Sequence, residues 1–187
     1  MQENNYKTEP PSEGEEFLAQ FFKDEDISFE SEKRIDNLIG DEKTYRKADF
    51  YLTRYKMYVE FFGLYNFSQE HKASYNAKKR TYIANNIPCI YLYPENLGII
   101  KHSFQHRMQK ELKEHKMKRE LFWFRCHLFF YDRASLFFWS ICSIILLFLL
   151  DYNKPFKEVI PIVAFVFSVI FFQSYRFYKG YLKYFKN

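Results

Sequence analysis

Up to about residue 100, the chain alternates between helical and strand-like patterns of apolar positions. Apolar residues recur every three or four positions over 13–23, and Ser12 with Glu15 has the spacing of a capping box, so a helix is expected there. Short runs rich in β-branched and aromatic residues predict strands, and a polar run with tyrosines on one side predicts a second helix. In chain order we expect a helix at 13–23, strands at 27–35, 47–54 and 57–62, a helix at 66–85, a strand at 87–93 and a loop at 94–98.

This order of elements predicts an α/β fold over residues 12–100, preceded by a disordered stretch at 1–11. Only Tyr55 and Lys56 separate the second and third strands, which should therefore form a hairpin. Roughly 90 residues are enough for one small hydrophobic core.

Residues 101–130 are rich in lysine and arginine. Phe104, Met108 and Leu112 recur at intervals of four, which predicts an amphipathic helix over 101–120 with a basic polar face. Two interpretations of this helix stay open: a solvated stalk beside an anionic membrane, or a DNA-contacting surface.

Two uncharged runs follow, at 134–150 and 159–175, each 17 residues long. A helix of about 17 residues is the lower limit for crossing a bilayer. The connector at 151–158 contains Pro155, so the sequence predicts a transmembrane helical hairpin over 131–178, followed by a basic tail at 179–187. The alternative, a buried hairpin in a soluble protein, would need polar residues on one face of each helix.

Basic residues flank the predicted hairpin on both outer sides, which places both chain ends in the cytoplasm. The expected location is a bacterial inner membrane, which the chain would cross twice. The composition, rich in aromatic residues and lysine and poor in glycine, is typical of an AT-rich bacterial genome.

Charge is distributed unevenly along the chain. Residues 1–100 carry 13 Lys and Arg against 17 Asp and Glu, although the whole chain has a net charge of +5. An acidic domain is unusual for a free DNA-binding protein, and the basic segment at 101–125 could compensate for it. The 23 Phe and 16 Tyr exclude a disordered chain. Three cysteines without paired spacing indicate reduced thiols.

Candidate catalytic or metal-binding residues lie in the predicted β-hairpin, where Asp49 and Glu60 occupy adjacent strands. Acidic residues are rare inside strands, and two neighbouring carboxylates repel each other unless a cation lies between them. Oxygen ligands of this kind suit Mg²⁺, and Glu15 could supply a third acid. The alternative is a polar outer face of the hairpin. His102 and His106 also have metal-ligand spacing, but no third ligand lies nearby in the sequence.

The segments SEGEEFLAQFF, FESEK and KADFYLTRYKMYVEFFG, followed by a lysine-bearing helix and IPCIYLY, resemble the PD-(D/E)XK nuclease superfamily. The resemblance covers about residues 12–97. It is strongest to very short patch repair endonucleases and to nuclease domains attached to helicases. It implies a restriction-endonuclease-like mixed sheet flanked by helices, a Mg²⁺ or Mn²⁺ cofactor, and hydrolysis of DNA, with RNA as a further candidate substrate.

Within this resemblance, Asp49 matches the first acid of the motif, with Ala48 in place of proline, and Glu60 matches the second. Glu15 matches the helix acid of many members, with Glu16 as a substitute. Phe62 stands where the motif has its lysine. The resemblance then implies that the next helix supplies the lysine, with Lys78 as the first candidate and Lys79 and Lys72 after it. The implied catalytic residues are Glu15, Asp49, Glu60 and Lys78, and the implied metal ligands are Asp49, Glu60 and the Phe61 carbonyl.

The function expected from the sequence is a membrane-anchored, metal-dependent nuclease on the cytoplasmic face, in defence or DNA processing. Two alternatives stay open. One is a catalytically degenerate nuclease-like fold that acts as a membrane-bound interaction or sensing module, and the other is a small channel or membrane-perturbing effector. The expected partners are DNA, the lipid bilayer, and a second copy of the chain or another membrane protein.

Overall fold

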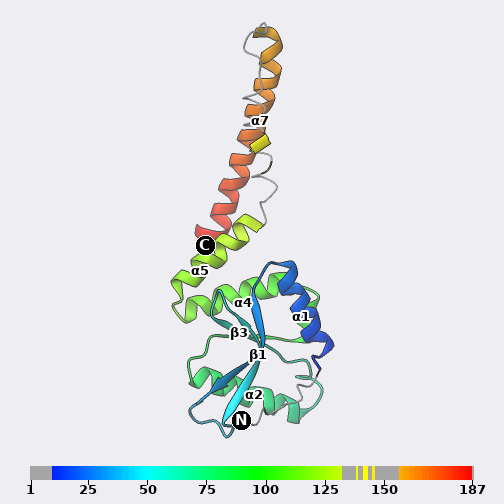
Figure 1. Cartoon of the computed structure of the whole chain (residues 1–187), viewed down its shortest axis with the longest axis vertical. Helices are drawn as coiled ribbons and strands as arrows, with labels where there is room; N and C mark the ends of the chain where they lie inside the picture. The colour runs from blue at the N-terminus through cyan, green and yellow to red at the C-terminus, as the bar shows by residue number, and fades with distance from the viewer. Residues whose placement is uncertain (1–9, 132–137, 139–140, 143–144, 146–155, 187) are drawn as a thin grey trace, which may run out of the picture. The chain divides into compact units, whose positions relative to one another are not determined.

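The structure is a computed structural model that describes residues 10–131, 138, 141–142, 145 and 156–186 (Figure 1). The chain divides into two compact units, Met1–Leu121 and Phe122–Asn187. The stretch at 1–9, where disorder is predicted, lies outside the described residues. The same holds for most of the first predicted membrane span and for residues 151–155 of its connector.

The first unit is built on a four-stranded mixed sheet in the order β1-β2-β3-β4. Strands β1 to β3 are antiparallel, whereas β3 and β4 are parallel and are joined through α2. The predicted α/β class and the predicted β-hairpin of β2 and β3 are therefore confirmed. The strands are β1 (Phe29–Asp36), β2 (Tyr45–Leu52), β3 (Met57–Phe61) and β4 (Cys89–Leu92), and the helices of this unit are α1 (Glu13–Asp24), α2 (Gln69–Ala84), α3 (Pro94–Leu97) and α4 (Ile100–Glu114).

Aromatic side chains from α1 and α4 pack on one face of the sheet. The ring of Phe22 in α1 lies 5.3 Å from that of Phe50 in β2 and 5.4 Å from that of Phe104 in α4. On the other face, Tyr82 of α2 joins Phe62 in a second buried cluster. The sheet is thus covered by helices on both faces, and α2 has one face to itself (Figure 1).

Polar caps set the starts of the two helices next to the site. Ser12 and Glu15 form the predicted capping box at α1, with the Ser12 N–H donating to Glu15 Oε2 over 2.7 Å. Helix α2 begins at Gln69, three residues later than predicted, because the Ser68 hydroxyl accepts the N–H of His71 over 3.2 Å.

Two predictions after β4 are wrong. The expected loop at 94–98 contains the short helix α3, with Pro94 at its first position, where a missing N–H costs nothing. The expected single helix at 101–120 breaks into α4 and α5 (Lys118–Tyr131), and Lys116 between them has a φ of 56°. The apolar face of α4 is buried in the core, so this helix is part of the α/β unit and not a solvated stalk.

The second unit contains α7 (Phe156–Tyr181) and a π-helical turn, η1 (Leu182–Lys186). Within the part of the chain that the structure describes, we find no helix that combines the length and the apolar character needed to cross a membrane. The predicted transmembrane hairpin thus has no support there, and its second predicted span, 159–175, lies within α7. Several large apolar side chains of α7 are exposed, among them Phe165, Phe167 and Phe171.

Candidate active site

Asp49 lies where the pairing of β2 is interrupted on both sides. Residues 50–52 of β2 pair with residues 57–59 of β3, and this pairing stops before Asp49. There the Phe61 N–H of β3 donates instead to the side chain of Asp49, at Oδ2, over 2.6 Å. On the other side, the register of β1 with β2 continues on both sides of Glu32 and Asp49 but omits that pair. Glu32 has a φ of 50°, a conformation that costs energy for a residue other than glycine. The Asp49 carboxylate therefore takes a place that a backbone carbonyl fills in a regular sheet.

Glu60, in β3, is 1% exposed, and both of its carboxylate oxygens accept hydrogen bonds from α2. Tyr82 donates its hydroxyl to Oε1 over 2.9 Å, and the Lys78 ammonium donates to Oε2 over 2.5 Å. Lys78 and Tyr82 are four residues apart and so share one face of the helix. One turn of α2 therefore fixes the orientation of the Glu60 carboxylate.

Lys78 connects three elements of the fold. Besides Glu60 in β3, its ammonium donates to the Lys47 carbonyl of β2 over 2.8 Å. The two alternative lysines contact aromatic rings: the ammonium of Lys79 lies 5.0 Å from the Tyr91 ring centroid, and that of Lys72 lies 5.5 Å from the Tyr65 ring centroid. Of the three lysines proposed from the sequence, Lys78 is the one that the structure brings to the acidic pair.

Phe62 occupies the position at which the PD-(D/E)XK motif has its lysine. It stands two residues after Glu60, is fully buried, and stacks on Tyr75 of α2 with ring centroids 4.3 Å apart. A charged side chain at this position would be buried among aromatic rings at a large cost in free energy. The aromatic ring docks α2 on the sheet, and α2 in turn carries Lys78.

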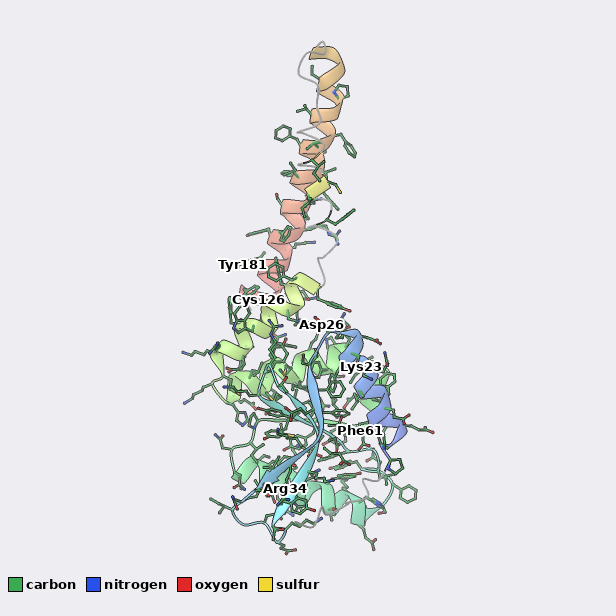
Figure 2. The ribbon with its side chains drawn as sticks, viewed as in Figure 1. Lys23, Asp26, Arg34, Phe61, Cys126 and Tyr181 are labelled. Carbon is green, nitrogen blue, oxygen red and sulfur yellow. The ribbon has the colours of Figure 1, made fainter. Side chains whose placement is uncertain are left out.

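The first turn of α1 closes the other side of the site. A Cβ atom on Gly14 would lie 2.1 Å from the ring of Phe61, so only glycine allows this approach. Phe61 is labelled in Figure 2. Glu15 shares a cavity of about 490 Å³ with Asp49, and its carboxylate accepts the Ser12 N–H. The alternative acid, Glu16, is exposed and lines the same cavity.

The pKa values of both acids at the site lie above their usual range. Burial and, after it, the charge of Asp49 raise the pKa of Glu60 to about 8, against the opposing effects of Lys78 and Tyr82. Burial also raises the pKa of Asp49 to about 6, against the opposing effects of Lys78 and the Phe61 N–H. Lys78 lowers both pKa values without returning them to their usual range, and a divalent cation beside the two carboxylates would lower them further.

The oxygen atoms at the site suit a hard divalent cation. Among the described residues, no three Asp, Glu, His or Cys side chains lie close enough together to hold one metal ion. Mg²⁺ is commonly held by one or two carboxylates, with water and substrate oxygens completing its shell. Asp49, Glu60 and the Phe61 carbonyl offer such a set, because a carboxylate oxygen that accepts one hydrogen bond keeps a second lone pair. His102 and His106 lie on the exposed side of α4, with nearly parallel rings 6.5 Å apart.

The role of Tyr82 did not emerge from the sequence, although its spacing of four residues from Lys78 was the available signal. The break opposite Asp49 also has no distinct signature in β1, because Glu32 is one of several charged residues along that strand. No model of a known protein family, no curated protein and no solved structure matches this chain.

Proposed function

We propose that the first unit is a divalent-metal-dependent nuclease that hydrolyses phosphodiester bonds of DNA. The observation that carries the proposal is the position of the Lys78 ammonium, held on Glu60 beside Asp49. A chain that resembles the PD-(D/E)XK nucleases but has Phe62 in the lysine position needs a lysine from elsewhere. Helix α2 brings one to the required carboxylate.

Each residue of the site has a separate role in the proposed hydrolysis. Asp49, Glu60 and the Phe61 carbonyl would hold Mg²⁺ or Mn²⁺, which when bound lowers the pKa of a coordinated water and offsets the charge of the phosphate. Lys78 orients the attacking water and stabilises negative charge that develops on the phosphate oxygens. Tyr82 holds the Glu60 carboxylate in place through its 2.9 Å hydrogen bond. Glu15 adds negative charge beside Asp49, whose pKa it raises.

The test uses the whole chain, purified in a mild detergent, with supercoiled plasmid, single-stranded DNA and RNA as substrates in Mg²⁺, Mn²⁺ or EDTA. Asp49→Asn, Glu60→Gln and Lys78→Met should each lower the rate by at least about 100-fold, as expected for loss of a group that stabilises the transition state. Lys72→Met, on an exposed part of the same helix, is the matched control and should cut like the wild type. A wild-type chain that neither cuts these substrates nor binds Mg²⁺ in calorimetry would overturn the proposal.

The second candidate function is a membrane-bound interaction or sensing module with a degenerate site. It is favoured by Glu60, both of whose oxygens already accept hydrogen bonds within the protein. A folded but inert chain in the experiment above would support this candidate.

We further propose that the second unit attaches the protein to the cytoplasmic face of a bacterial inner membrane. The support is the exposure of Phe165, Phe167, Phe171 and Phe172 on α7, with exposed fractions between 59% and 77%, together with the uncharged runs at 134–150 and 159–175. Exposed apolar surface of this extent is unfavourable in water. The wild-type chain should stay in the membrane pellet after alkaline carbonate extraction, whereas recovery in the soluble fraction would exclude this attachment.

A further inference from the structure

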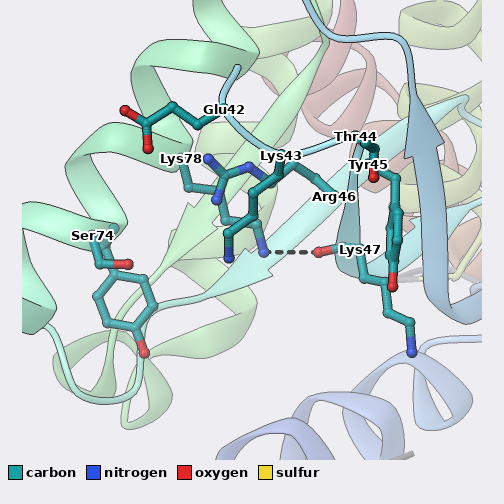
Figure 3. A pocket seen from close by; sticks show the side chains of 9 residues that line it. Glu42, Lys43, Thr44, Tyr45, Arg46, Lys47, Ser74 and Lys78 are labelled. Carbon is teal, nitrogen blue, oxygen red and sulfur yellow. Dashed lines mark hydrogen bonds between the residues drawn. The ribbon is translucent and has the colours of Figure 1, made fainter. Parts of the chain in front are cut away.

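A second cavity, of about 700 Å³, lies beside Lys78 between residues 42–47 and α2 (Figure 3). Its size falls within the range of about 300–1,000 Å³ usual for small-ligand sites. The lining combines basic side chains, two tyrosine rings and two hydroxyl groups. The lining residues are Glu42, Lys43, Thr44, Tyr45, Arg46, Lys47, Ser74, Tyr75 and Lys78.

The rim of this cavity is held in place by side-chain hydrogen bonds. The Asp41 carboxylate accepts two bonds from the Arg46 guanidinium, at 2.6 and 2.7 Å, and one from the Lys43 N–H at 3.1 Å. The Asn85 side chain, at the end of α2, bonds both the N–H and the carbonyl of Ile39. The segment that forms the rim is thus anchored to α2, and the cavity exists before any ligand binds.

The two tyrosine rings are also fixed. Tyr75 stacks on the buried Phe62 at 4.3 Å, and the Arg34 guanidinium lies 4.2 Å from the ring centroid of Tyr45. Both tyrosines are half-buried. Because the rings are already ordered, little side-chain entropy is lost when a planar ligand stacks on them.

The cavity adjoins the candidate active site at Lys78 and Lys47. Lys78 lines the cavity and donates to Glu60, and its ammonium also bonds the Lys47 carbonyl. Lys47 in turn lines both this cavity and the one that contains Asp49. A polymer with one phosphate at Asp49 and Glu60 would therefore place a neighbouring unit in this cavity.

Aromatic rings beside lysines are the combination that binds single-stranded nucleic acid, since every base can stack on a ring and every phosphate can meet a cation. A paired base lies inside the helical stack and cannot enter a pocket unless it is extruded. We propose that the cavity between residues 42–47 and α2 holds an unpaired nucleotide next to the cleaved phosphate, with its base on Tyr45 and its phosphate on Lys43. The substrate of the protein is then single-stranded DNA. This inference rests on the proposed function, because it takes Asp49 and Glu60 to bind the cleaved phosphate.

The test measures binding separately from cutting. The whole chain, with Glu60→Gln in every sample and EDTA present, is titrated into a labelled DNA strand of about 12 nucleotides, as a single strand and as a duplex, and anisotropy is recorded. The single strand should bind at least about 10-fold more tightly than the duplex, given the usual strength of stacking on a protein ring. Tyr45→Leu should weaken single-strand binding about 5- to 100-fold, and Tyr45→Phe, which keeps the ring, should not.

The lysine is tested through the salt dependence of binding. Lys43→Ala should reduce the slope of log K against log salt concentration by about 0.7, the value for one phosphate contact on a single strand. Lys23→Ala, on the exposed side of α1, removes the same charge outside both cavities and should leave the slope unchanged. Thermal unfolding of each variant identifies any that fail to fold.

The outcomes separate this inference from the proposed function. If the wild type cuts DNA but the duplex binds as tightly as the single strand, or Tyr45→Leu and Lys43→Ala bind like the wild type, the inference is overturned and the nuclease stands. If the single strand binds through the cavity but the wild type never cuts it with Mg²⁺ or Mn²⁺, the assignment of the cavity stands and the proposed nuclease function is overturned. If the chain binds no nucleic acid in this assay and the wild type cuts none with Mg²⁺ or Mn²⁺, both proposals are overturned.

Discussion

The Nζ atom of Lys78 lies 2.5 Å from Oε2 of Glu60, although 18 residues separate the two along the chain. Helix α2 connects β3 to the parallel strand β4. It packs on the face of the sheet that carries the Glu60 side chain, and this brings Lys78 to the carboxylate. With Tyr82 on the other oxygen, the carboxylate is held by two donors from one helix. Four predictions follow from this arrangement and from the packing around it.

Replacement of Lys78 by methionine should destabilise the protein as well as inactivate it. The change keeps the length of the side chain but leaves the buried Glu60 without its cation, and the expected loss in the free energy of unfolding is about 1–3 kcal/mol. Urea denaturation of the wild type, Lys78→Met and Lys72→Met measures it. The loss should be larger at pH 9 than at pH 6, because Glu60 can become neutral at the lower pH. An equal loss at both pH values would contradict this origin of the effect.

The stability of the metal-free protein should fall as the pH rises through the neutral range. Burial, together with the charge of Asp49, raises the pKa of Glu60 from 4.5 to about 8, so the folded chain binds a proton that the unfolded chain releases. The stabilisation is complete below about pH 4.5 and is lost as the pH rises through about 8. Thermal unfolding in EDTA from pH 5 to pH 9 checks the sign.

The control for this pH dependence is Glu60→Gln, which should show a shallower decline because its side chain does not titrate. Added Mg²⁺ should stabilise the wild type more at pH 8 than at pH 6, since the ion competes with protons for the same carboxylates. If Glu60→Gln declines as steeply as the wild type, the decline comes from other groups.

Replacement of Tyr82 by phenylalanine removes one hydroxyl from the site. Glu60 then loses the donor to Oε1, which favours its charged form, so its pKa should rise further. The cost in stability should be about 1 kcal/mol, and cleavage should fall about 10-fold at neutral pH but recover in part at higher pH. A pH–rate profile of the variant beside the wild type tests this. An unchanged profile would show that the hydroxyl does not act on the charge of Glu60.

Alanine at Gly14 should disturb the site from the side of α1. The added methyl group would lie 2.1 Å from the ring of Phe61, whose N–H holds Asp49. Overpacking of this kind costs about 1–3 kcal/mol. Gly98→Ala is the matched control, because no atom of the described residues lies within 4 Å of its Cβ position. Chemical denaturation should show a loss for Gly14→Ala alone, and equal stability of the two variants would contradict the packing described here.

Much of the site could be predicted from local signals. The capping box depends on Ser12 and Glu15, three positions apart, and the β-hairpin depends on the two-residue gap at Tyr55 and Lys56. The two acids of the hairpin, Asp49 and Glu60, lie on either side of this gap. The sequence indicates Lys78 because Phe62 fills the position at which the motif has its lysine. The contact of Lys78 with Glu60 agrees with that choice, while its catalytic role stays a prediction.

The parts that could not be predicted depend on distant residues. An amphipathic pattern such as that of Phe104, Met108 and Leu112 is the same for a helix on a membrane and a helix on a sheet. The end of α4 has no glycine or proline, and Lys116 takes up the left-handed conformation there. The rim of the 700 Å³ cavity depends on Asn85, which is 46 residues away from its partner Ile39.

The delivery of the lysine by α2 has a consequence for the order in which the protein matures. A newly synthesised chain that has emerged only as far as the β2–β3 hairpin contains both acids but not Lys78. The three groups come together only when α2 docks through Phe62 and Tyr75. Under the proposed function, a growing chain on the ribosome is harmless to nearby nucleic acid until this helix has emerged and closed over the sheet.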